Sequence, residues 1–148
     1  MRKLLIIAAV LLAPLIAHGE DATAPQGVIE ITVTNIENGS GTLYVAILNS
    51  PDDWLKSDAE SKPFREATQA VSSTDDLLIS VEGLPPGQYA ISLFQDINGD
   101  TEMDTNFIGF PKEPFGFSAP MGKFGPPKYE DAVVNFSGED ISVNISLN

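Results

Sequence analysis

Oxygen-bearing side chains occupy every second position of one short segment, residues 96–104. The series consists of Asp96, Asn98, Asp100, Glu102 and Asp104. Ca²⁺ is a hard cation that prefers six to eight oxygen ligands, and a chain curling around it points alternate side chains inward. The carboxylates of the series repel one another unless a cation lies between them. The spacing therefore predicts a calcium loop, and we expect Glu113 to add a ligand from outside the segment.

This segment begins like the calcium loop of an EF-hand but does not continue like one. Its first five positions match the consensus D-x-[DN]-x-[DN]-G. The sixth position, which needs glycine, is Thr101, and the twelfth, which needs a bidentate Glu, is Phe107. We therefore expect a calcium loop inserted between strands. The alternative is a solvated acidic turn, because Asp, Asn and Gly are also the common residues of turns.

Aromatic residues follow the acidic segment. Loops longer than ~15 residues are usually functional or disordered, and the abundance of phenylalanine between residues 96 and 130 favours an ordered insertion. Two interpretations stay open. The rings form a small core that holds the loop down, or they form an exposed platform for a sugar, a peptide or a protein. The platform residues would be Phe107, Phe110, Phe115 and Phe117.

The residue types that are missing exclude most catalytic chemistry. The chain has no cysteine, and its one histidine, His18, lies in the N-terminal leader. A mature chain without them cannot form a Cys/His zinc site, a Ser-His-Asp triad, a thiol nucleophile or a His-ligated haem. We therefore expect no enzymatic activity. The alternative is a small hydrolase with paired carboxylates, acting on glycans or assisted by a metal.

The first nineteen residues have the three-part layout of a secretory signal peptide. A positive start is followed by an apolar run, residues 4–16, and by small residues before Glu20. The run contains Pro14 and is shorter than the ~20 residues that a membrane-spanning helix needs. We expect residues 1–19 to be removed and residues 20–26 to form a flexible N-terminus. The mature protein would be exported, periplasmic or extracellular, without membrane insertion.

The chain is strongly acidic, with 8 Lys and Arg against 21 Asp and Glu and a net charge of −13. Loss of Arg2 and Lys3 with the leader leaves six basic residues and a net charge near −15. Such a charge repels the phosphates of nucleic acids and anionic lipids. We expect no nucleic-acid partner, and a cell-envelope protein or a glycan is the partner class that remains.

The elements that position these residues have a period of two from residue 27 onward, which is typical of strands with one buried face. We expect the first two strands to pair as a hairpin across the turn at 38–41. The strand beginning at Ile29 would be an exposed edge, and Trp54 and Phe64 would cover an edge of the fold. The expected strands span residues 29–34, 42–48, 67–72, 77–81, 88–95, 132–136 and 141–147.

About seven short strands with almost no helix predict an all-β fold, an antiparallel two-sheet sandwich of immunoglobulin-like type. Residues 27–148 would form a single domain, with residues 96–130 inserted before the last two strands. An eight-stranded barrel is the alternative. A Pro-Gly turn leads into Tyr89, which predicts a tyrosine corner, in which the phenol hydroxyl ties the turn to the sandwich.

Four motifs follow one another in the second half of the chain, at residues 84–91, 96–100, 103–106 and 109–118. In this order they resemble DUF2141, a family of bacterial exported proteins of unknown function, and the resemblance extends from about residue 27 to 147. It implies a secreted or periplasmic β-sandwich and no established activity. The family pattern reads D-x-N-x-N-G-x-x-D. The resemblance therefore implies an ion site at Asp96, Asn98, Asp100 and Asp104, with Thr101 at the position of the glycine. The Pro-Gly-x-Tyr turn also resembles those of transthyretin-like and carboxypeptidase regulatory domains.

Taken together, these patterns favour a secreted, non-enzymatic binding or structural module with Ca²⁺ at the loop 96–104. Besides the hydrolase, one further alternative is a calcium-dependent adhesion or assembly module. In that case copies would pair through an exposed strand edge, since unpaired edges invite association.

Overall fold

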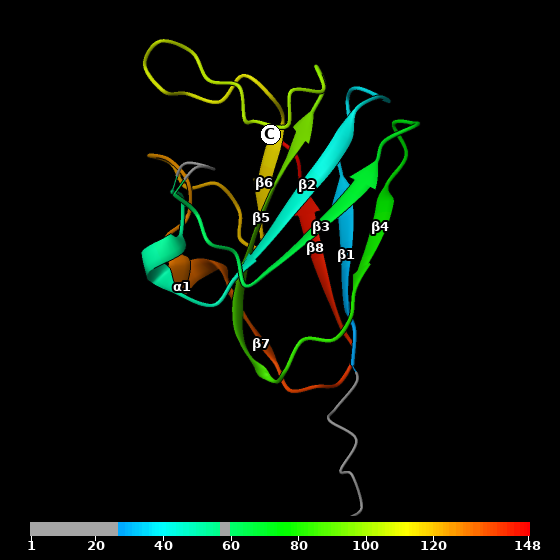
Figure 1. The fold of residues 1–148 in the computed structure, drawn as a ribbon, viewed down its shortest axis with the longest axis vertical. Coiled ribbons are helices and arrows are strands. Elements are labelled where there is room, and N and C mark those ends of the chain that lie inside the picture. Colours follow the sequence, from blue (N-terminus) through cyan, green and yellow to red (C-terminus); the bar gives the residue numbers. More distant parts are fainter. Residues whose placement is uncertain (1–26, 57–59) are drawn as a thin grey trace, which may run out of the picture.

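The computed structural model describes residues 27–56 and 60–148, which form two β-sheets packed face to face (Figure 1). The predicted signal peptide, 1–19, and the predicted flexible N-terminus, 20–26, lie outside the described residues. Almost no helix is present in the described part: a 3-10 turn, η1 (Pro51–Asp53), and one short helix, α1 (Tyr129–Ala132). The predicted sandwich is confirmed.

Eight strands make up the two sheets of the described part. The three-stranded sheet has the order β4-β1-β8, and the five-stranded sheet has the order β3-β2-β5-β6, with β7 also paired to β5. The strands are β1 (Ile29–Thr34), β2 (Thr42–Leu48), β3 (Arg65–Ala70), β4 (Leu77–Val81), β5 (Gly87–Asp96), β6 (Phe115–Phe117), β7 (Val133–Phe136) and β8 (Ile141–Ser146).

Strand β1 corrects two predictions. It lies in the centre of the three-stranded sheet, antiparallel to β4 and parallel to β8, so it is not an exposed edge. It also does not form a hairpin with β2, which belongs to the other sheet. The connection 35–41 bends at Asn35 and Gly41, both with positive φ, and crosses between the sheets. Two strands that each have one apolar face bury more surface when those faces are stacked than when they lie side by side, and alternation alone does not distinguish the two arrangements.

The core fills the space between the sheets with alternate residues of the inner strands, whereas β3 has no fully buried residue. Ile31 of β1, Val45 of β2 and Ile91 of β5 are 0–2% exposed. Full burial of such an aliphatic side chain stabilises the fold by roughly 1.5–3 kcal/mol relative to exposure. The predicted period of two therefore identifies the core correctly.

The predicted tyrosine corner is confirmed at the start of β5. The Tyr89 hydroxyl donates a hydrogen bond to the Pro85 carbonyl oxygen at 2.7 Å. Tyr89 is 2% exposed, and burial raises the pKa of its phenol above the usual value. The ring of Phe64 lies 5.7 Å from the Tyr89 ring, between centroids, and packs over this end of the sandwich.

Strand β6 divides the predicted insertion, residues 96–130, into two excursions, and β7 follows the second of them. Both strands pair with the same neighbour: β6 with Ser92–Phe94 and β7 with Gly87–Ala90 of β5. Residues 97–114 and 118–132 are therefore separate loops that leave the sheet and return to it. Gly116 faces β8, where an added Cβ would lie 2.6 Å from a methyl carbon of Ile145. Strand β6 has only 3 residues, which are too few to show alternation of apolar and polar side chains, so the sequence did not predict it.

Candidate functional site

The acidic segment 96–104 begins on the last residue of β5. Asp96 is 1% exposed and Glu113, which returns from the first excursion, is 7% exposed. The two Asp96 carboxylate oxygens accept hydrogen bonds from the backbone N–H groups of Gly99, at 2.7 Å, and Thr101, at 2.9 Å. The loop therefore folds around a buried carboxylate that bonds its own backbone.

Glu113 acts in the same way from the opposite side of the loop. Its Oε1 accepts the N–H of Ile97 at 2.8 Å, and its Oε2 accepts the N–H of Asp104 at 3.2 Å. Hydrogen bonds to an ionised acceptor are about twice as strong as neutral ones. These bonds satisfy N–H groups that have no partner strand, so Asp96 and Glu113 hold both ends of the segment.

The Asn98 side chain links the other predicted ligands. Its Nδ2 donates to Asp100 Oδ2 at 3.0 Å and to Asp104 Oδ2 at 3.1 Å, so an amide group lies between these two carboxylates. Glu102 contributes to the wall of a neighbouring cavity. Within residues 27–56 and 60–148, no group of three or more His, Cys, Asp or Glu side chains is placed to hold a metal ion. The structure thus brings the predicted ligands into one hydrogen-bonded loop but does not focus them on one point.

Thr101 adopts a left-handed backbone conformation within this loop, with φ of 69°. A β-branched residue is an outlier there because its side chain crowds the backbone. Its N–H bonds Asp96, so the buried carboxylate holds the strained residue in place. This is the position at which the resemblance expects glycine, and the observed φ gives the physical reason for that preference.

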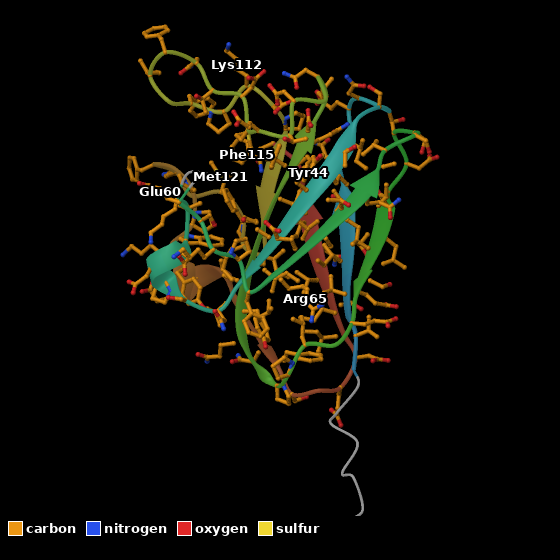
Figure 2. All side chains as sticks on the ribbon, viewed as in Figure 1. Tyr44, Glu60, Arg65, Lys112, Phe115 and Met121 are labelled. Carbon is orange, nitrogen blue, oxygen red and sulfur yellow. The ribbon has the colours of Figure 1, made fainter. Side chains whose placement is uncertain are left out.

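A cavity of about 760 Å³ lies on the outer face of the five-stranded sheet. Figure 2 labels three of its lining residues, Tyr44, Phe115 and Met121. The cavity floor includes Tyr44 of β2 and Phe94 of β5, whose rings stack with centroids 5.3 Å apart and planes at 16°. Phe115 and Phe117 of β6 stand beside them on the same face. Residues of three loops line the rest, among them Asp53, Leu55, Lys56, Ser61, Glu102, Met103, Thr105, Phe110, Met121 and Pro126.

Trp54 connects two of these loops. Its indole N–H donates to the Pro127 carbonyl oxygen at 2.9 Å. Its ring lies 5.5 Å from Phe117 and 6.1 Å, edge-on, from Tyr129. Burial raises the pKa of the Tyr129 phenol. Trp54 therefore packs on β6, the edge strand of the five-stranded sheet, as expected for a residue that covers an edge of the fold.

The predicted aromatic platform is divided by the structure. Phe115 is 9% exposed and, with Phe117 and Phe110, lines the cavity. Phe107 is 98% exposed and lies outside it. Sequence reasoning missed Tyr44 and Phe94, although a signal was present. Both lie on the strand face opposite the core residues, where a solvated sheet would carry polar side chains.

The fold and the site together define a class: a β-sandwich whose outer sheet face is covered by ordered loops around an aromatic cavity. The sequence matches a family model described as "Uncharacterized protein conserved in bacteria (DUF2141)" over residues 31–144. The chain belongs to this family, as the resemblance predicted. No curated protein and no solved structure matches the chain. None of the helices in the described residues is long and apolar enough to cross a membrane.

Proposed function

We propose that the protein is an exported, non-enzymatic binding module whose ligand site is the cavity on the outer face of the five-stranded sheet. The observation that carries this proposal is the cavity itself. Its volume of about 760 Å³ is within the range of 300–1,000 Å³ that is usual for small-molecule sites. The stacked pair Tyr44–Phe94 is fixed by strand pairing, so the site needs little reorganisation to bind.

The lining indicates the chemistry of the ligand. Apolar side chains, including aromatic rings and two methionines, supply most of the wall, and charged groups such as Asp53, Lys56 and Glu102 are interspersed. Lys56 Nζ lies 3.5 Å from Asp53 Oδ1, so its charge is partly compensated. Such a site suits a cell-envelope molecule with an extended apolar surface and a polar end, or the flat face of a sugar ring.

The arrangement of the buried acids supports a non-enzymatic function. Asp96 and Glu113 are the acidic residues that the described part buries most completely. Each of their four carboxylate oxygens accepts a backbone N–H. A glycosidase needs one carboxyl group that protonates the leaving group and a second that faces the sugar. Asp96 and Glu113 instead serve as anchors of the loop.

Calcium at the loop 96–104 is a second, separable part of the proposal. The alternate oxygens and the approach of Asp100 and Asp104 to the single Asn98 amide support it. The oxygens of Asp96 and Glu113 already accept backbone N–H groups. The loop therefore suits a weakly held ion that keeps several water ligands, and it does not suit an ion bound by protein oxygens alone. We expect a dissociation constant on the order of 10⁻⁴–10⁻³ M, as in extracellular modules. Calorimetric titration with Ca²⁺ tests it, with D104N as the weakened variant; absence of heat at millimolar ion would leave a self-supported acidic turn.

The cavity is tested with a fluorescent naphthalene dye that brightens in apolar sites. The variant Ala46→Trp places a large side chain on the cavity floor and should lower dye affinity at least tenfold. Ser80→Trp, on the polar outer face of the other sheet, is the matched control and should bind like the native chain. Displacement of the dye by a fatty acid, an oligosaccharide or a peptide would then rank the ligand classes. A native chain that does not brighten the dye would remove the proposal.

A further inference from the structure

Two turns of the insertion hold apolar side chains out into solvent. The first turn, residues 105–111, carries Phe107 at 98%, Ile108 at 74% and Phe110 at 57% exposure. The second turn, residues 122–125, carries Phe124, which is fully exposed. Single exposed apolar residues are common on protein surfaces, but a gathered set marks an interaction site.

Hydrogen bonds fix the first turn in this shape. Thr105 and Pro111 form a bridge that closes its base. Asn106 Oδ1 accepts the N–H groups of Ile108 and Phe110, both at 3.0 Å. The Asn106 backbone N–H donates to the Phe110 carbonyl oxygen at 2.8 Å. The rings at the tip are therefore presented by a closed turn, and they take no part in holding it together.

The second turn is built in a similar way. Gly122 and Gly125 pair as a bridge, with the Gly122 N–H donating to the Gly125 carbonyl oxygen at 2.9 Å. Lys123 and Phe124 occupy the tip of this turn. Both turns line the same cavity, through Phe110 and Gly125. They extend to the same side of the molecule, on the left of Figure 1 in yellow-green and orange.

The two turns themselves carry no acidic residue, although Asp53 and Glu102 line the cavity that both turns border. Residues 105–112 and 114–128 contain no acidic residue, in a chain with 21 of them. Lys112 stands at the base of the first turn, where Figure 2 labels it, and Lys123 adjoins Phe124 in the second. Apolar rings combined with nearby lysines are typical of surfaces that lie at a membrane–water interface, where rings reach the acyl boundary and ammonium groups remain among the headgroups.

We propose that these two turns dock onto the surface of a phospholipid bilayer, with Phe107, Ile108, Phe110 and Phe124 in the headgroup region. A fluid interface accepts two separate tips without a matching shape, whereas a protein partner would need a groove for each. Lys112 and Lys123 would lie near lipid phosphates. The acidic remainder of the chain keeps the contact peripheral and favours zwitterionic over anionic lipid. This inference does not depend on the cavity ligand.

Co-sedimentation of the exported chain with phosphatidylcholine vesicles tests the proposal. The native chain should pellet with the vesicles, and the double variant Phe107→Ser/Phe124→Ser should lower the bound-to-free ratio at least tenfold. Leu78→Ser is the matched control, because Leu78 is 56% exposed on β4 of the other sheet. It should bind vesicles like the native chain. Unchanged melting curves of all three chains show that folding is retained.

Three results would overturn the docking surface. The first is a native chain that stays in the supernatant, which would leave the turns to a protein partner. The second is a double variant that pellets as well as the native chain. The third is a Leu78→Ser variant that loses as much binding as the double variant, which would indicate unspecific adsorption of exposed apolar residues.

Discussion

The acidic segment and the aromatic turns are neighbours in one insertion, yet they are buried in the reverse of the usual order. Asp96 and Glu113 are 1% and 7% exposed, whereas Phe107 and Phe124 are fully or almost fully exposed. Charged residues are rarely buried unless they are paired, and large apolar residues are usually inside. The difference shows that in an irregular loop the need to bond the backbone decides which side chains are buried.

The backbone explains both halves of this comparison. Segment 97–104 has no partner strand, and buried N–H groups without an acceptor are costly. Asp96 and Glu113 supply four acceptor oxygens to that backbone. In the turn 105–111, the side-chain oxygen of Asn106 likewise accepts backbone N–H groups. The rings of that turn are not needed for its folding, which leaves them available for contacts outside the molecule.

The largest expected effect tests the buried acid directly. Asp96→Ala leaves the N–H groups of Gly99 and Thr101 without an ionised acceptor. Bonds to charged groups contribute about 1.5–3 kcal/mol each, so the free energy of unfolding should fall by about 3 kcal/mol. Urea denaturation measures it. Asp100→Ala, at an exposed position of the same loop, is the control and should cost under about 1 kcal/mol; equal losses would mean that burial of Asp96 adds nothing.

Glu113→Gln is a milder change at the other anchor. It keeps the shape of the side chain but replaces one acceptor oxygen with an NH₂ group, which then faces the N–H of Ile97 or Asp104. We expect the free energy of unfolding to fall by about 2 kcal/mol. Glu66→Gln on the exposed edge strand β3 should stay within about 0.5 kcal/mol. A stable Glu113→Gln would show that one buried carboxylate suffices to hold the loop.

The sequence predicted the sandwich well because the core depends on a local pattern. Alternation identified the inward residues of β1, β2 and β5, and the Pro-Gly turn identified the bond of Tyr89. It did not identify which strands pair, since β1 and β2 have the same alternation whether they share a sheet or face each other across the core. Pairing is a property of the whole chain and not of the two segments.

The candidate site was predicted less completely for a different reason. Oxygen atoms at every second residue suit an ion and also suit backbone N–H groups, and both uses require the same residue types. The sequence therefore identified Asp96 and Glu113 as candidate ligands, but it did not show that they bond backbone N–H groups. The cavity depends on Tyr44 and Phe94, which come from different strands and meet only through the register of β2 with β5.

Thr101 provides a smaller test, in which the loop should become more stable. Glycine at this position removes the strain of a positive φ, which costs about 1–2 kcal/mol for other residues, and part of this gain is offset by the greater entropy of the unfolded chain. We expect Thr101→Gly to raise the free energy of unfolding by about 1 kcal/mol. Thr101→Ala keeps a Cβ and should gain much less. If glycine destabilised the loop, the Thr101 side chain would have a role that outweighs its strain.

The smallest expected effect concerns the exposed tips. Phe107→Ser and Phe124→Ser should each shift the melting temperature by less than about 2 °C, because surface substitutions away from hydrogen-bonded networks change stability little. Combined with Asp96→Ala, either change should be additive within about 0.5 kcal/mol, as expected for sites that share no partner. Coupling well above that value would mean that the rings help to fold the acidic loop, and the contrast between anchoring acids and free aromatic rings would then be lost. Additivity would instead show that these phenylalanines do not help to fold the acidic loop and are free for a contact outside the folded chain.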